Sequence, residues 1–169
     1  VEAISATRNN LVVALFENVR GGVYVYRPNP SGDWARTRLA LPENVTVGVG
    51  SASDRDDQVF VSAAGYLTPS TLYLADAGTG ALAAVKSLPA KFDAQGLTVQ
   101  QFEARSADGT MIPYFVVHRE TAPMDGSNPT LLYGYGGFEI SQLPGYSAPM
   151  GKLWLERGGV YVVANTRGG

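Results

Sequence analysis

The sequence has 169 residues with a formal net charge of −2 at pH 7, and 45% of the residues are hydrophobic. This content suits one packed domain or two small ones, and it excludes an intrinsically disordered chain. The absence of cysteine excludes disulfides, thiolate metal sites and cysteine nucleophiles, and charges of mixed sign without basic runs argue against a nucleic-acid partner. No apolar run approaches the length that spans a membrane, so we expect no membrane partner.

The first half of the chain predicts short β-strands separated by turns. The segments are rich in β-branched and aromatic residues, and none shows a helical period of useful length. A turn cluster at Pro28–Asp33 contains two prolines, a glycine and an aspartate. The expected strands are Leu11–Phe16, Val23–Tyr26, Arg36–Leu41, Val45–Val49, Val59–Ser62, Thr71–Leu74 and Leu82–Leu88.

A weak internal repeat runs through this half. In each unit a strand, a loop and a second strand follow one another, and Tyr24 and Tyr73 at matching positions are 49 residues apart (73 − 24). Propeller blades repeat at about 40–50 residues, but an all-β sandwich also gives strands of this spacing. The pattern alone therefore leaves a propeller and a sandwich as equal interpretations.

The second half begins with a polar linker, Pro89–Gly96, after which the pattern changes. An Asp-Gly pair at 108–109 lies between two apolar runs, Thr98–Ala104 and Met111–His118. This predicts a β-hairpin, because both turn residues tolerate positive φ. Pro113 lacks an N–H, so we expect its strand to lie at a sheet edge or to contain a bulge there.

The remaining segment predicts a strand, a turn, a helix and a strand in βαβ-like order. Thr130–Tyr133 is a short apolar strand, and Val160–Asn165 is a continuous apolar run typical of a covered central strand. Apolar residues at helical spacing predict a helix over Ser147–Arg157, which the glycines at 158 and 159 end. Because such a sheet needs further neighbours, we expect the chain to be a piece of a longer protein.

The most informative stretch is Tyr133–Phe138, with the sequence Tyr-Gly-Tyr-Gly-Gly-Phe. The sequence matches neither of two phosphate-binding motifs. A dinucleotide fingerprint needs glycine at position 139, which is Glu139, and a P-loop needs Ser or Thr at position 153, which is Leu153. In α/β-hydrolases a loop after a buried strand supplies part of the oxyanion hole, for which the hydroxyl of Tyr133 or Tyr135 would be a donor. A plain tight turn among core aromatics is the alternative interpretation.

Four segments, in the expected order, resemble the prolyl oligopeptidase family of serine peptidases. Thr68–Tyr73 is similar to the family's last propeller blade, and Arg105–Phe115 is similar to the first hairpin of its catalytic domain. Pro129–Phe138 resembles the segment that opens the catalytic core, and Gly158–Gly169 resembles the next strand with its Arg-Gly-Gly loop.

The resemblance implies a mainly β fold with a little α. Residues 1–93 would form about two C-terminal blades of a partial β-propeller. Residues 94–169 would form the opening hairpin, strands and one helix of a truncated α/β-hydrolase domain. In this family the second Tyr of the glycine-rich motif, here Tyr135, donates its hydroxyl to the oxyanion, and the closing Phe, here Phe138, lines the pocket for the substrate proline.

The family's Ser, Asp and His triad lies downstream of an Arg-Gly-Gly loop like this one, so the resemblance places no triad residue in this chain. It implies that the parent protein is a serine-type endopeptidase that needs no cofactor. Its partners would be short proline-containing peptides, hydrolysed on the carboxyl side of proline. The chain alone is predicted to be inactive.

Ser147 and His118 are the candidates within the chain for a Ser–His pair. Ser147 nearly matches the nucleophile elbow Gly-x-Ser-x-Gly, but Pro149 occupies the last position. His118 is predicted to be an exposed strand-end residue, and one His without Cys provides too few ligands for zinc. The acidic segment Asp54–Asp57 lacks the Gly and Glu of an EF-hand, so we expect a solvated turn between strands.

Two other functions remain as alternatives. A non-catalytic β-sheet binding module would use the Tyr/Gly turn as a ligand surface, and a related peptidase of the same superfamily would have a different specificity. We expect a cytoplasmic protein, with the periplasm as the alternative compartment. Unpaired strand edges also predict self-association of the chain.

Overall fold

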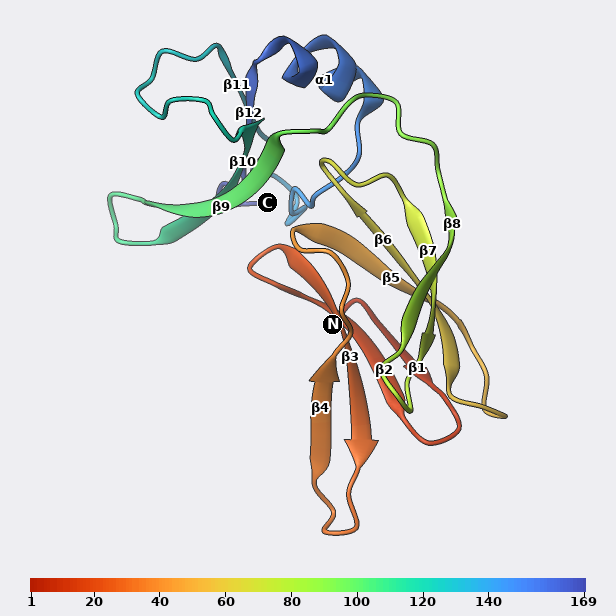
Figure 1. Cartoon of the computed structure of the whole chain (residues 1–169). Coiled ribbons are helices and arrows are strands. Elements are labelled where there is room, and N and C mark those ends of the chain that lie inside the picture. The colour runs from red at the N-terminus through yellow and green to blue at the C-terminus, as the bar shows by residue number, and fades with distance from the viewer.

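The computed structural model describes all 169 residues and contains three four-stranded β-sheets and one α-helix (Figure 1). The first sheet has the order β1-β2-β3-β4 and the second β5-β6-β7-β8, so each is an antiparallel meander. Their strands are β1 (Ala3–Ala6), β2 (Leu11–Glu17), β3 (Arg20–Pro28), β4 (Trp34–Arg38), β5 (Val45–Ala52), β6 (Gln58–Gly65), β7 (Thr71–Asp76) and β8 (Leu82–Ser87).

The two meanders confirm the interpretation as a partial β-propeller, and the repeat seen in the sequence corresponds to two neighbouring blades. The predicted strands are present, and the structure adds β1, whose four residues are too few to show alternation clearly. Strand β4 ends at Arg38 rather than at Leu41. Leu39 and Leu41 instead leave the sheet and are buried in the core.

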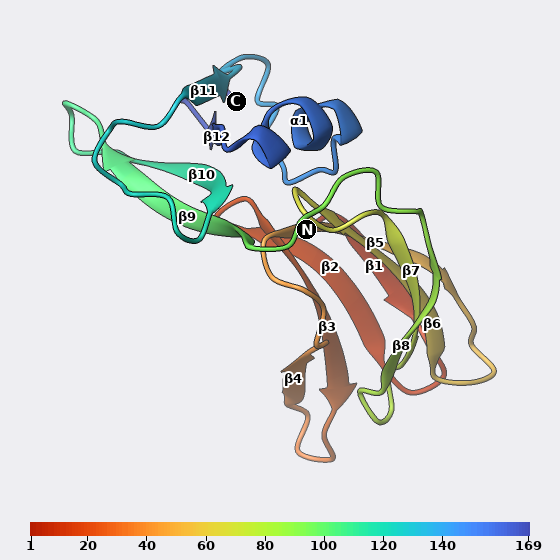
Figure 2. The same ribbon diagram turned by 45° about the horizontal axis from the view of Figure 1, so that its top comes forward.

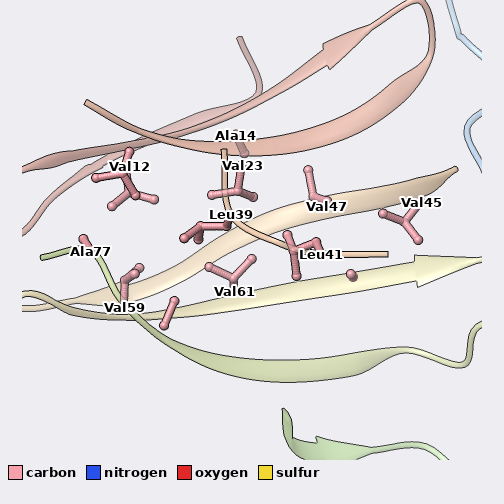
Figure 3. Packing of buried hydrophobic residues seen from close by; sticks show 13 residues of the cluster. Val12, Ala14, Val23, Leu39, Leu41, Val45, Val47, Val59, Val61 and Ala77 are labelled. Carbon is pink, nitrogen blue, oxygen red and sulfur yellow. The ribbon is translucent and has the colours of Figure 1, made fainter. Parts of the chain in front are cut away.

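A core of 13 buried residues lies between the first two sheets. Figure 3 shows Leu39 and Leu41 between the valines of β2 and β3 and those of β5 and β6. Full burial of a Val or Leu side chain contributes about 1.5–3 kcal/mol, so this core is the main stabilising element of both blades. The sheets approach so closely that a Cβ on Gly21 would lie 2.6 Å from the carbonyl oxygen of Val45.

Asp57 links the two blades by hydrogen bonds. Its carboxylate accepts from Thr7 Oγ1 at 2.7 Å, from Asn9 N at 2.9 Å and Asn9 Nδ2 at 2.8 Å, and from Asn10 Nδ2 at 2.9 Å. The expectation of a wholly solvated acidic turn is therefore wrong for this residue, which is half-buried, although Asp54 is exposed. Desolvation acts to raise the pKa of Asp57, but the bonds from Asn9, Thr7 and Asn10 outweigh it and lower the pKa to about 2.

The third sheet has the order β11-β12-β10-β9 and follows the linker after β8. Its strands are β9 (Leu97–Arg105), β10 (Met111–Arg119), β11 (Thr130–Gly134) and β12 (Val160–Ala164). β9 and β10 form the predicted Asp-Gly hairpin, β10 pairs antiparallel with β12, and β11 pairs parallel with β12. Figures 1 and 2 place this sheet and the helix α1 (Ala148–Leu153) at one end of the first two sheets.

A second buried cluster joins this sheet to its surroundings. Phe115 of β10 contacts Tyr66, which follows β6, with ring centroids 5.4 Å apart. Phe92 of the linker stacks on Tyr146 at 5.0 Å and lies against Gly151 of α1, where a Cβ would fall only 1.9 Å from its ring. The linker and the second blade thus share one core with the third sheet.

Two local predictions need correction. The helix covers Ala148–Leu153 only, with Ser147 as its N-cap, and a 3₁₀ turn (Leu155–Arg157) completes the predicted segment. Pro113 lies in an interior strand with a continuous register to β9. It faces Asn165, just beyond the last residue of β12, so its missing N–H interrupts no ladder. No helix in the structure has the length and apolar character required to cross a membrane.

Candidate functional site

The glycine-rich turn and the Arg-Gly-Gly turn meet at one edge of the third sheet. Strands β11 and β12 are parallel, and their last residues, Gly134 and Ala164, are paired. Two parallel strands end at the same edge, and the carboxyl ends of such strands are the usual position of ligand sites in α/β folds. The turns that follow, residues 135–140 and 165–169, therefore lie next to each other.

Interlocking backbones hold the two turns together. Gly136 has φ of 65°, and a Cβ there would lie 2.5 Å from Thr166 Oγ1. Gly168 has φ of 89°, and a Cβ there would lie 2.6 Å from the carbonyl oxygen of Gly136. Both positions require glycine for backbone conformation and for space, which explains the spacing of glycines in the two motifs.

Tyr135 and Phe138 project from the first turn into solvent. The side chain of Tyr135 is 50% exposed and that of Phe138 is 89% exposed. Phe138 and the following Glu139 adopt left-handed backbone conformations, with φ of 54° and 56°. This conformation is unfavourable for residues with a Cβ, and such strain is concentrated at functional sites. Neither ring belongs to a buried cluster of the chain, so the turn is not packed among core aromatics.

Hydrogen bonds fix the second half of the turn. Glu139 N donates to the carbonyl oxygen of Gly168 at 2.9 Å, and Ile140 N donates to that of Gly137 at 3.1 Å. Beyond them, Gln142 N donates to Asn165 Oδ1 at 2.7 Å, and Asn165 Nδ2 donates to the carbonyl oxygen of Gln142 at 3.2 Å.

Arg167 connects this site to the tip of the β9–β10 hairpin. Its guanidinium forms an ion pair with Asp108 and donates to Ser106 Oγ at 3.1 Å. Hydrogen bonds from Thr110, followed by the bond from Arg167, lower the pKa of the Asp108 carboxyl. The sequence motif contained Arg167 and Asn165, but only the structure shows which groups they contact.

The structure does not bring Ser147 and His118 together as a catalytic pair. Ser147 caps α1, its hydroxyl accepting from Met150 N at 3.4 Å. His118 of β10 is only 4% exposed, so the prediction of an exposed strand-end residue is wrong. Both ring nitrogens of His118 have partners, Nδ1 at 2.7 Å from the carbonyl oxygen of Arg119 and Nε2 at 3.0 Å from Gln100 Oε1.

Within residues 1–169, no three side chains of His, Cys, Asp or Glu gather closely enough to hold a metal ion. The site presents two exposed aromatic side chains on one turn, and the hydroxyl of Tyr135 is a hydrogen-bond donor.

Comparison with known proteins gives consistent results along the whole chain. The family model described as "Prolyl oligopeptidase, N-terminal beta-propeller domain" matches residues 1–87. An uncharacterized peptidase, y4nA, of Sinorhizobium fredii is 50% identical over 169 residues, which are 100% of this chain and 23% of that protein.

Solved structures support the same relationship. A post-proline cleaving enzyme from Rickettsia typhi is 34% identical and has a TM-score of 0.75, over 98% of this chain and 24% of that one. Prolyl oligopeptidase B from Galerina marginata, solved with a bound 25mer macrocyclization substrate, is 25% identical with a TM-score of 0.82, over 99% of this chain and 23% of that one. The chain thus spans about a quarter of the length of these relatives. It belongs to the prolyl oligopeptidase family of serine peptidases, with residues 1–87 in the family's N-terminal β-propeller.

Proposed function

We propose that the full-length protein that carries this sequence is a serine endopeptidase that cleaves short peptides on the carboxyl side of proline. The observation that carries the proposal is the turn after β11, which exposes Tyr135 and Phe138 at the carboxyl edge of two parallel strands. The relatives named as post-proline cleaving enzyme and prolyl oligopeptidase support the same specificity.

In the proposed reaction Tyr135 stabilises the oxyanion. Attack on the scissile carbonyl places negative charge on its oxygen, and a hydroxyl held at hydrogen-bond distance lowers the free energy of that state. The interlock between Gly136 and Thr166 holds the turn rigid, so little reorganisation is needed when the charge develops. Loss of one such donor typically costs about 2.7–4 kcal/mol in the transition state.

Phe138 is the proposed contact for the substrate proline. Its ring is large, flat and almost fully exposed, and no neighbour in the chain covers it. A pyrrolidine ring is apolar and has no N–H to bind, so an aromatic surface is a suitable partner for it.

The nucleophile and the base are proposed to lie outside this chain. Ser147 and His118 are both engaged in local hydrogen bonds, and the relatives are about four times as long. We propose that residues 94–169 are the first part of an α/β-hydrolase domain and that the isolated chain does not hydrolyse peptides. Turnover of a fluorogenic prolyl peptide by the purified chain of confirmed mass would contradict this.

The test of Tyr135 is Tyr135→Phe in the full-length protein, with Tyr133→Phe as the comparison. Tyr133 precedes it in the same motif and is 45% exposed, so it is the competing donor. We expect Tyr135→Phe to lower kcat by about 10²–10³-fold with little change in KM, and Tyr133→Phe to leave kcat near the wild-type value. The reverse result would assign the oxyanion contact to Tyr133, and wild-type kcat in both variants would remove the motif from the reaction.

A further inference from the structure

The turn that presents Phe138 has an unfavourable backbone and needs external support. Phe138 and Glu139 are consecutive left-handed residues, with φ of 54° and 56°, and neither is glycine. The Phe138 ring, 89% exposed, makes no core contact that would hold the conformation. Residues in such conformations persist only where the surrounding structure fixes them.

Asn165 provides a large part of that support. Its side-chain Oδ1 accepts from Gln142 N at 2.7 Å, and its Nδ2 donates to the Gln142 carbonyl at 3.2 Å. One amide side chain thus satisfies both backbone groups of a loop residue, as a neighbouring strand would. The backbone of Asn165 is itself anchored, because its N–H donates to the carbonyl oxygen of Pro113 at 2.9 Å.

The two ends of the strained pair are held by different groups. Within the pair Glu139 N donates to the Gly168 carbonyl, and before the pair Gly136 packs against Thr166. Beyond the pair, Ile140 N donates to the Gly137 carbonyl at 3.1 Å, and the Asn165 side chain holds both backbone groups of Gln142. Removal of the Asn165 side chain would therefore loosen the segment that follows Phe138 and Glu139 and leave the contact between Gly136 and Thr166 in place.

We propose that Asn165 is a positioning residue that fixes the direction of Phe138 and, through it, the preference for proline at the cleaved position. The inference rests on the proposed function. Asparagine is required because one planar group must donate and accept at the same time. Aspartate retains the acceptor for Gln142 N but loses the donor to the Gln142 carbonyl, and alanine loses both.

The test compares Asn165→Ala and Asn165→Asp in the full-length protein, using matched peptides with proline or alanine at the cleaved position. We expect the ratio of kcat/KM for proline over alanine to fall by about tenfold or more in Asn165→Ala, mainly through KM for the prolyl peptide. The fall should be smaller in Asn165→Asp. Asn29→Ala is the control, because Asn29 is exposed in the β3–β4 turn and its side chain forms no hydrogen bond in the structure.

A double-mutant cycle separates positioning from general structural damage. If Asn165 acts through Phe138, then Asn165→Ala will not lower the selectivity ratio further in a Phe138→Ala background. The proposal would be overturned if Asn165→Ala lowered kcat/KM equally for the prolyl and alanyl peptides, or if its effect on the selectivity ratio added to that of Phe138→Ala. Tyr135→Phe is expected to lower kcat without changing the ratio, so a failure of the oxyanion role and a failure of the Asn165 role give different results.

Hydrogen–deuterium exchange gives a readout independent of activity. We expect the amides of the segment 139–142 to exchange at least about tenfold faster in Asn165→Ala than in the wild-type protein, with β12 unchanged. Unchanged exchange in that segment would overturn the proposal even if the variant were less active. If the segment exchanged faster in Asn165→Ala but the wild-type full-length protein cleaved no prolyl peptide, the role of Asn165 in holding the loop would be supported and the proposed function would be refuted.

Discussion

The charge of Asp57 is expected to stabilise the contact between the two propeller blades. Its pKa of about 2, against an ordinary value of 3.8, corresponds to at most about 2.4 kcal/mol of stability at neutral pH. The side chain is half-buried, and solvent screening at such a position reduces the contribution to about 1–2 kcal/mol. Asp57→Asn retains the size but places an NH₂ group among donors from Thr7, Asn9 and Asn10.

The pH dependence follows from the direction of the shift. The folded chain holds the Asp57 pKa below the unfolded value, so the stabilisation is complete above about pH 5. It is lost as the pH falls from about 4 toward 2, because the unfolded state takes up the proton first. At pH 3 roughly half of it remains, so the difference in unfolding free energy between wild type and Asp57→Asn should shrink by about 0.5–1 kcal/mol relative to pH 7.

Urea-induced unfolding, followed by far-UV circular dichroism at pH 7 and pH 3, measures this difference. The matched control is Asp54→Asn, since Asp54 is exposed in the same loop and forms no side-chain hydrogen bond in the structure. It should change the unfolding free energy by less than about 0.5 kcal/mol at either pH. An Asp57→Asn effect equal to that of the control, or one that does not change between the two pH values, would refute the reasoning.

Three further substitutions test the packing. Tyr66→Phe should raise the unfolding free energy by about 1 kcal/mol in urea titration, because the buried hydroxyl has no partner; a loss would mean that the hydroxyl is hydrogen-bonded in solution. On an open surface Gly151→Ala would stabilise the helix by about 1 kcal/mol through helix propensity. Here the new Cβ would lie 1.9 Å from the Phe92 ring, so we expect the substitution to destabilise the protein and lower the melting temperature. Gly136→Ala, which would place a Cβ 2.5 Å from Thr166 Oγ1, should abolish prolyl-peptide hydrolysis by the full-length protein while its circular dichroism stays native.

The strands were predictable because local pattern and local structure agree. In β6 the residues alternate between exposed and buried, and the Asp-Gly turn at 108–109 sits at the tip of the β9–β10 hairpin, with Gly109 at φ of 89°. His118 was misjudged because its burial depends on strand order. β10 is an interior strand, and the ring of His118 bonds to Gln100 of β9, 18 positions away, which no pattern within the strand reveals.

The candidate site was predictable only in part. The glycine-rich motif and the resemblance selected Tyr135 and Phe138, and the structure exposes both on one turn. The contacts that hold the turn join residues more than twenty positions apart, as in the pair Gln142 and Asn165. A single sequence gives no signal for such a pair, because an asparagine after a strand is also typical of an ordinary loop.

The turn that carries Phe138 is held by the propeller as well as by the third sheet. Two residues beyond Gln142, the carbonyl oxygen of Pro144 accepts a hydrogen bond of 2.6 Å from Thr46 Oγ1 of β5. Asn44, just before β5, donates to the Val99 carbonyl of β9 at 3.2 Å, so the same end of the second blade contacts the third sheet twice. The segment after Phe138 therefore runs between two anchors, Asn165 on the sheet that bears the site and Thr46 on the blade. If residues 94–169 were separated from the blades, this segment would retain only the first anchor, so the second blade contributes to the support of the turn.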